Sequence, residues 1–417
     1  MESTREVQFL ALTTKLATAA LLLGSAAAAH LAPRQATSNA PACPNLSISG
    51  SGGRKIAIVV DTSGSNSWTD PSNLRVVAAR TLNDALVSNA EAAASGTQAD
   101  QVTVVDFDGS AAVIYELGDP AGAIPFDLLD SSGSTYIASG VEAAITELTK
   151  GPDPTADRTG IVVLTDGSDS YTEQLISAID NATANGIRIS FGFLPERSSA
   201  ATDPDVQAAI LRTGGQYAIF SSAESQQSFV NLVLANGLTN DLTASNTSST
   251  LVSGLSITAF VAASGSNKFT YNAQAGETLN YNLTSITAGT LDATLTDASG
   301  AELKTASTDT NTTFTVDVAN AGELVLSVTA SNTSSAALLQ VGVSSSLGIS
   351  NCILTPDNTT VPGNTTVPGN RTNTTVPSST VSRPAQYTGA AVAVTGSQGF
   401  ATTAFAVVSF AFVAFLV

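Results

Sequence analysis

The stretch K-I-A-I-V-V-D-T-S-G-S-N-S, residues 55–67, is the segment around which we expect the fold to be organised. Its apolar run, residues 56–60, is short and does not alternate with polar residues, which is typical of a strand buried on both faces of a parallel sheet. The run leads directly to Asp61, Ser63 and Ser65 on a tight loop. Open α/β sheets bind ligands at the carboxyl ends of their strands. One carboxylate and two hydroxyls there predict an oxygen site for a hard divalent cation, with coordination positions left open.

Two later loops supply further oxygen donors. Residues 133–137, G-S-T-Y-I, place Thr135 on a loop, and residues 161–167, I-V-V-L-T-D-G, place Asp166 after a second buried strand. With the first loop, they resemble the metal-ion-dependent adhesion site of von Willebrand factor A domains, a resemblance that covers residues 55–238. It implies five metal ligands, some of them acting through water: Asp61, Ser63, Ser65, Thr135 and Asp166. Taken alone, the first loop is equally consistent with a helix N-cap.

The resemblance also implies a cofactor and a partner. The expected ion is Mg²⁺, with Ca²⁺ or Mn²⁺ as alternatives, and it would accept an acidic side chain of a protein ligand. Capture of the ligand can be coupled in this family to movement of the final helix, here residues 225–236. Trp68 either rims the ligand surface, which we favour, or covers the end of the sheet. A second metal site is conceivable, although solvated turn carboxylates are the preferred interpretation of four further acids: Asp70, Asp106, Asp108 and Asp169.

Strands and helices alternate through residues 54–240, which predicts an α/β domain with a doubly wound, mostly parallel sheet. The expected helices are 72–89, 137–150, 171–185, 205–212 and 225–236, and the expected strands after the first are 102–107, 160–165, 187–194 and 216–220. An edge hairpin should run from 102–107 into 111–117 through Asp108-Gly109.

Residues 241–353 lose the helical spacing and show short alternating segments with turn signals, which predicts an antiparallel β-sandwich. Cys43 and Cys352 flank both predicted domains, and they are the two cysteines of the chain. In an oxidising compartment they would form one disulfide, and otherwise two free thiols. If they pair, the lead-in 30–53 would contribute one strand to the sandwich.

We expect targeting signals at the two ends of the chain. Residues 1–29 resemble a secretory signal peptide, and residues 354–388 form a Thr/Pro-rich repeat typical of a glycosylated stalk. Residues 389–417 match a glycolipid-anchor signal with attachment at Gly389, a transmembrane anchor being the alternative. Acceptor sequons for N-glycosylation begin at Asn45, Asn181, Asn246, Asn282, Asn311, Asn332, Asn358, Asn364, Asn370 and Asn373.

Composition narrows the class of function. The formal net charge of −18 over 417 residues argues against binding to nucleic acid. His30, the one histidine, precedes the predicted folded region, so no Ser-His or Cys-His pair and no histidine metal ligand is available there. We therefore expect a non-enzymatic, secreted adhesion or ligand-binding protein, anchored at a cell surface or wall and fungal in style. The alternatives are a structural wall glycoprotein and a carboxylate-only metal hydrolase. The sequence does not indicate an oligomeric state.

Overall fold

The computed structural model describes residues 42–48, 52–123, 126, 133–150, 158–194, 203–238, 248–263, 265–287, 289–331, 336–348 and 352–356. Several predictions concern residues outside these ranges: the signal peptide, nearly all of the stalk, the anchor signal with Gly389, and the sequons at Asn246, Asn332, Asn358, Asn364, Asn370 and Asn373. Within these ranges, no helix is both long enough and apolar enough to cross a bilayer.

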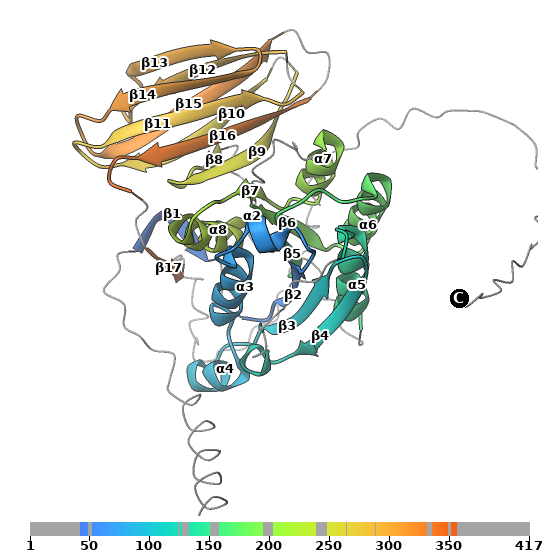
Figure 1. Ribbon diagram of the computed structural model, residues 1–417. Helices are drawn as coiled ribbons and strands as arrows, with labels where there is room; N and C mark the ends of the chain where they lie inside the picture. Colours follow the sequence, from blue (N-terminus) through green and yellow to red (C-terminus); the bar gives the residue numbers. More distant parts are fainter. Residues whose placement is uncertain are drawn as a thin grey trace, which may run out of the picture. The chain divides into compact units, whose positions relative to one another are not determined.

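The α/β part is built on six neighbouring strands, in the order β7-β6-β5-β2-β3-β4 (Figure 1). Five of them are parallel, and β4 runs antiparallel to β3 at the edge. Their bounds are β2 (Lys55–Asp61), β3 (Gln101–Phe107), β4 (Ala111–Gly118), β5 (Thr159–Thr165), β6 (Arg188–Phe193) and β7 (Tyr217–Ile219). The predicted doubly wound, mostly parallel sheet with an edge hairpin is confirmed.

Helices cover both faces of this sheet because its central strands are apolar on both sides. Ile56 and Ile58 of β2 pack in one hydrophobic cluster with α3 and α8, whereas Ala57 and Val59 pack in the opposite cluster with α5, α6 and α7 (Figure 1). A Cβ at Gly140 would lie 2.8 Å from Val59 Cγ1, so glycine there lets α5 lie close against β2. These helices are α3 (Leu74–Asp84), α5 (Ile137–Leu148), α6 (Thr172–Ala184), α7 (Pro204–Arg212) and α8 (Ala223–Asn236).

The segment predicted as one helix over 72–89 is divided. After α3 ends at Asp84, a separate α4 (Asn89–Ser95) begins at a capping box in which Ser88 and Glu91 bond each other's backbone N–H groups. Such a box satisfies amides that a new helix start leaves free, so it favours restarting the helix over continuing it. Two short elements were also not predicted: α2 (Asn66–Thr69) and the 3₁₀ turn η1 (Pro120–Gly122).

The later strands form two sheets around a shared apolar core. One has the order β13-β12-β15-β10-β8, and the other, β14-β11-β16-β9, continues through β9 into β7 of the α/β sheet. Their bounds are β8 (Ser248–Thr250), β9 (Leu255–Val261), β10 (Ser266–Ala273), β11 (Thr278–Ser285), β12 (Thr290–Thr296), β13 (Glu302–Thr308), β14 (Asn311–Asp317), β15 (Gly322–Ser331) and β16 (Ala337–Ser345). The pairing is antiparallel except between β8 and β10.

Alternation explains this second part of the fold. On β11, Leu279, Tyr281 and Leu283 are at most 1% exposed, while the intervening Asn280 and Asn282 face solvent. A side chain period of two places one row in the core and the other in water. The sequence did not predict the continuous sheet, in which β9 pairs antiparallel with β7 through Ala218 and Ile219.

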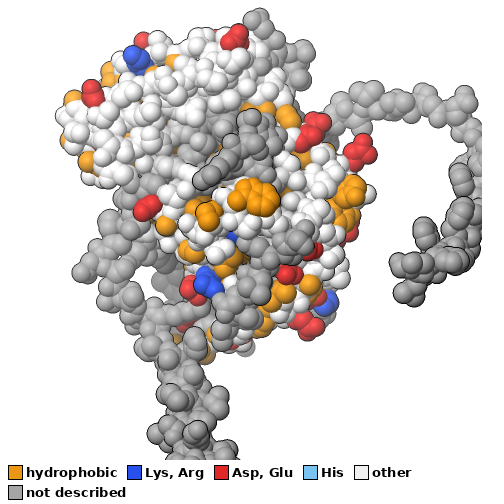
Figure 2. All heavy atoms as spheres, in the orientation of Figure 1, with side chains coloured by type: hydrophobic (Ala, Val, Ile, Leu, Met, Phe, Trp, Pro, Cys, Tyr) orange, Lys and Arg blue, Asp and Glu red, His pale blue; other side chains and the backbone are white. Residues whose placement is uncertain are grey.

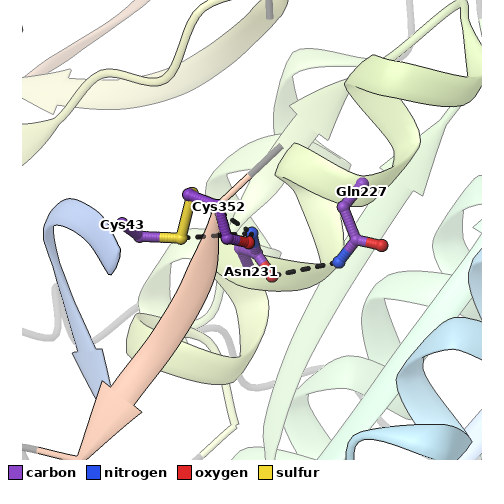
Figure 3. The surroundings of a disulfide bond; sticks show 4 residues. All are labelled: Cys43, Gln227, Asn231 and Cys352. Atoms are coloured by element: carbon purple, nitrogen blue, oxygen red, sulfur yellow. Dashed lines mark hydrogen bonds between the residues drawn. A yellow bond between two sulfur atoms is a disulfide. The ribbon is translucent and has the colours of Figure 1, made fainter. Parts of the chain in front are cut away.

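Cys43 and Cys352 form the predicted disulfide. Around it, β1 (Ala42–Ile48) and β17 (Ile353–Pro356) pair in parallel as a separate two-stranded sheet. The expectation that the early strand would join the sandwich is therefore wrong for the described residues, because β1 finds its backbone partners on β17. Asn231 of α8 donates to Cys43 Sγ at 3.4 Å and to the Cys352 carbonyl at 3.3 Å (Figure 3). The disulfide is thus docked on the last helix of the α/β part.

Candidate metal centre

Asp61 lies at the carboxyl end of β2 and is completely buried. Its Oδ1 accepts hydrogen bonds from the Ser63 backbone N–H at 2.8 Å and from Asn66 Nδ2 at 3.2 Å. Its Oδ2 accepts from the Thr165 hydroxyl at 2.5 Å. These donors turn the first loop back over the strand end and hold the carboxylate in one orientation.

Hydroxyls from two loops and a carboxylate from a third meet beside Asp61. Ser63 Oγ lies 3.2 Å from Ser65 Oγ, and the Thr135 hydroxyl donates to Ser63 Oγ at 3.2 Å. The Ser65 hydroxyl donates to Asp166 Oδ1 at 3.1 Å. The structure therefore brings together all five residues predicted to form the site: the side-chain oxygens of Thr135, Ser63, Ser65 and Asp166 form one hydrogen-bonded chain, and Asp61 joins it through the Ser63 backbone N–H.

Backbone hydrogen bonds tie the loops to one another. The Gly64 N–H donates to the Gly133 carbonyl at 3.2 Å, and the Ser170 N–H donates to the Thr135 carbonyl at 2.9 Å. The carboxylate of Asp169 accepts from the backbone N–H groups of Ala138 at 2.9 Å and Tyr171 at 2.5 Å. Asp169 therefore satisfies the start of α5 from the neighbouring loop, and so joins the loop of Thr135 to the loop of Asp166.

Arg75, on the first turn of α3, supports the first loop from inside the protein. Its side chain is fully buried, and Nε donates to the Asp61 carbonyl at 2.6 Å. Nη1 forms an ion pair with Asp70 at 2.9 Å. Asp70 also accepts from the backbone N–H of Leu74 at 2.7 Å. The one carboxylate therefore both caps α3 and neutralises the charge of Arg75. Sequence reasoning missed Arg75.

The site concentrates negative charge away from water. Asp166 is as buried as Asp61, and the hydroxyls of Ser65 and Thr69 donate to it. Burial, followed by the nearby charge of Asp61, raises the pKa of Asp166 to about 6, against the opposing effects of those hydroxyls and of Arg75. Two carboxylates in one buried site favour a cation, which would relieve both their desolvation and their mutual repulsion.

Trp68 and the further acids considered for a second metal site lie outside the five-residue cluster. Trp68 of α2 is 62% exposed, so it does not cover the end of the sheet. Asp70 and Asp169 serve the caps described above, and burial followed by the charge of Asp108 raises the pKa of Asp106. Within the described ranges, no group of three or more His, Cys, Asp or Glu side chains could hold a metal ion.

Three described sequon residues, Asn181, Asn282 and Asn311, are exposed. Asn45 lies in β1. Exposure is necessary for glycosylation and does not by itself establish it.

A doubly wound α/β domain whose loops gather oxygen donors at the carboxyl ends of its strands belongs to the class that binds ligands at this edge. Residues 56–168 match the family model of the von Willebrand factor type A domain. The match spans β2 to the loop that carries Asp166, and together with the fold it supports assignment of this part of the chain to that domain family.

Two of the solved structures with a similar fold each cover less than half of the chain. BatB from Bacteroides thetaiotaomicron is 18% identical with a TM-score of 0.31, over 43% of this chain and 96% of that one. Proximal thread matrix protein 1 from the mussel byssus, with a zinc-occupied MIDAS motif, is 18% identical with a TM-score of 0.36, over 45% of this chain and 47% of that one. The match thus spans about half the length of the mussel protein. No curated protein matches the chain.

Proposed function

We propose that the three loops hold one divalent cation, with Mg²⁺ as the expected ion, and that the protein uses this ion to capture an acidic side chain of a protein ligand. One observation carries the proposal: hydroxyls from two loops and the buried Asp166 on a third lie within hydrogen-bond distance of one another. Side chains that meet in this way from distant parts of the sequence are typical of a site built for a ligand.

The donor set fits the ion. Hard cations such as Mg²⁺ prefer oxygen ligands and retain water where protein ligands are few. The hydroxyls of Ser63, Ser65 and Thr135 and the carboxylates of Asp61 and Asp166 would hold the ion, directly or through water. When bound, it would supply a Lewis-acidic centre that accepts a carboxylate from outside. The chain's own contribution is to fix the loops, through Arg75 and the backbone hydrogen bonds described above.

The proposal places this activity outside the cell. The Cys43–Cys352 disulfide supports an oxidising compartment, because such bonds are rare in proteins of the cytosol. Export, glycosylation of a stalk and display through a glycolipid anchor remain the expectations from the sequence. In this reading the protein is a non-enzymatic surface receptor or adhesin.

Metal titration tests the site. We expect the purified protein to bind Mg²⁺ or Mn²⁺ in isothermal titration calorimetry, and Asp61→Ala and Thr135→Ala to weaken binding by tenfold or more, about the effect of losing 1.4 kcal/mol. Thr146→Ala is the matched control, since its hydroxyl is exposed on α5 and bonds the Glu142 carbonyl of its own helix. Unchanged metal affinity in Thr135→Ala would contradict the proposed site.

Ligand capture requires a second measurement. Immobilised peptides with a central Glu should bind in Mg²⁺ and not in chelator, and the same peptides with Gln should not bind. Equal binding under all conditions, with a lower melting temperature for Asp61→Ala, would favour a purely structural metal site in a wall glycoprotein. Metal-dependent turnover in a substrate screen would instead support the hydrolase alternative.

A further inference from the structure

Aromatic side chains lie next to each of the three site loops. Trp68 follows Ser65 by three residues, Tyr136 directly follows Thr135, and Tyr171 lies five residues after Asp166. Trp68 is 62% exposed and Tyr171 is 55% exposed, which makes them the first and third most exposed large hydrophobic side chains among the described residues, with Leu347 at 56% between them.

Two of the rings, those of Tyr136 and Tyr171, are also held in place. Tyr136 and Tyr171 pack edge to face with centroids 5.3 Å apart, and the Tyr136 hydroxyl donates to Gln174 Oε1 at 2.6 Å. Trp68 belongs to α2, and Figure 2 shows hydrophobic side chains at the surface in the region of that helix. We call Trp68, Tyr136 and Tyr171 the aromatic rim. Ordered, exposed aromatic rings beside a binding site are typical of contact residues, because they bury large area at little entropic cost.

The loops around the site carry negative charge with no basic residue among them. Residues 61–70, 106–110, 133–139 and 165–174 contain no Lys or Arg. Their acids are Asp61, Asp70, Asp106, Asp108, Asp166, Asp169 and Glu173. One divalent cation and the buried Arg75 would neutralise three of these charges, so the edge would remain net negative. A ligand that brings one carboxylate to the ion therefore benefits from positive charge on either side of it.

We propose, building on the metal-dependent capture above, that the partner is a basic protein segment with a single acidic anchor residue. Its carboxylate would bind the ion, and flanking Lys or Arg side chains would lie over the rings of Trp68 and Tyr171. Cations are attracted to the faces of aromatic rings, and Trp is the strongest such partner. The same net charge disfavours a polyanionic ligand such as a polyuronate. The aromatic rim and the surrounding acids thus determine specificity, and the metal loops determine anchoring.

Four probes of equal length separate these contributions. The first is a fluorescein-labelled peptide with one Glu between two pairs of Lys. The second replaces Glu with Gln, the third replaces each Lys with Ser, and the fourth is an oligouronate. Binding is measured by fluorescence anisotropy with Mg²⁺ and with chelator, at low and high salt. Trp68 is the one tryptophan of the chain, so its intrinsic emission reports directly on occupancy of the rim.

We expect the Lys-flanked Glu probe to bind most tightly, by on the order of tenfold over the Ser-flanked probe at low salt, with the difference shrinking at high salt. Trp68→Ala and Tyr171→Ala should each weaken that probe by about two- to fivefold while leaving Mn²⁺ affinity in calorimetry unchanged. Ile114→Ala is the control, since Ile114 is 37% exposed on β4. It should change neither quantity.

The outcomes distinguish this inference from the function on which it rests. If the Ser-flanked probe or the oligouronate binds as tightly as the Lys-flanked probe in Mg²⁺, the basic partner is wrong and metal-dependent capture stands. If the Gln probe binds like the Glu probe, or chelator has no effect, metal-dependent capture fails. Absence of Mg²⁺-dependent binding of the Lys-flanked probe at millimolar concentration also overturns the inference.

Discussion

Replacing Asp166 with Asn should stabilise the metal-free protein at neutral pH. The buried carboxylate has a pKa raised to about 6 by burial and by the charge of Asp61. An unfolded Asp titrates near 3.9, so the difference of about two units corresponds to roughly 3 kcal/mol of destabilisation once the group is ionised. The amide of Asn removes the charge, and it can still bond the hydroxyls of Ser65 and Thr69, which both donate and accept.

The sign of the pH dependence follows from the raised pKa. Between about pH 4 and pH 6 the folded protein binds more protons at this position than the unfolded chain, so its stability falls as the pH rises. Above pH 6 the penalty is complete. Asp166→Asn has no carboxyl to ionise at this position and so avoids this penalty. The difference in the free energy of unfolding between the two proteins should therefore grow from near zero at pH 4 to roughly 3 kcal/mol above pH 6.

Thermal unfolding from pH 4 to pH 8 provides the assay. In chelator at pH 7.5, Asp166→Asn should melt several degrees higher than the parent protein. In Mg²⁺ the parent should gain stability with the concentration of the ion, and the variant should gain little. Asp180→Asn is the control, because Asp180 is 63% exposed and should change the melting temperature little. A lower melting temperature for Asp166→Asn in chelator at pH 7.5 would refute the reasoning.

Three further predictions concern the groups that hold the site together. Arg75→Met breaks the buried ion pair with Asp70, and Arg54→Met breaks a second buried ion pair, between Arg54 and Asp100 at 2.7 Å. Each should lower the free energy of unfolding by about 3–5 kcal/mol, measured by urea unfolding, but only Arg75→Met should weaken metal binding. Asp169→Asn should lower Mn²⁺ affinity in calorimetry, because Asp169 accepts its two backbone N–H groups on different oxygens and the amide keeps only one acceptor oxygen. Asp119→Asn should not, because Asp119 accepts two backbone N–H groups on Oδ1 alone and the amide keeps that oxygen. Reducing the disulfide should lower stability by about 2–5 kcal/mol; an unchanged melting temperature would contradict this.

The parts of the site that the sequence predicted are those with a local signature. Each of Asp61, Thr135 and Asp166 stands at a loop position next to a recognisable strand or helix, and parallel strands bring such positions to one edge of the sheet. The parallel sheet was predictable for the same reason, because its strands read as unbroken apolar runs.

The supporting contacts had no comparable signature. Arg75 is one polar residue in an otherwise helical pattern, although a base in the first turn of a helix opposes the helix dipole and so hints at a carboxylate partner nearby. Thr165 at the end of β5 and Asn66 at the start of α2 both donate hydrogen bonds to Asp61, and spacing in one sequence does not reveal these contacts. The pairings of β7 with β9 and of β1 with β17 join strand edges from different segments of the chain. No local periodicity encodes those partners.

These supporting contacts determine which side chains could coordinate an ion directly. Both oxygens of Asp61 already accept hydrogen bonds from protein donors, from Ser63 and Asn66 on one side and Thr165 on the other. Both oxygens of Asp166 likewise accept hydrogen bonds, from the hydroxyls of Ser65 and Thr69. That leaves the neutral hydroxyls as the groups freest to approach a cation. A divalent ion held with so little direct negative charge retains much of its Lewis acidity. A carboxylate from a ligand would then supply the direct negative charge that the protein does not provide to the ion. The weak neutralisation of the ion by the protein's own ligands is therefore the property that would make the site selective for an acidic anchor.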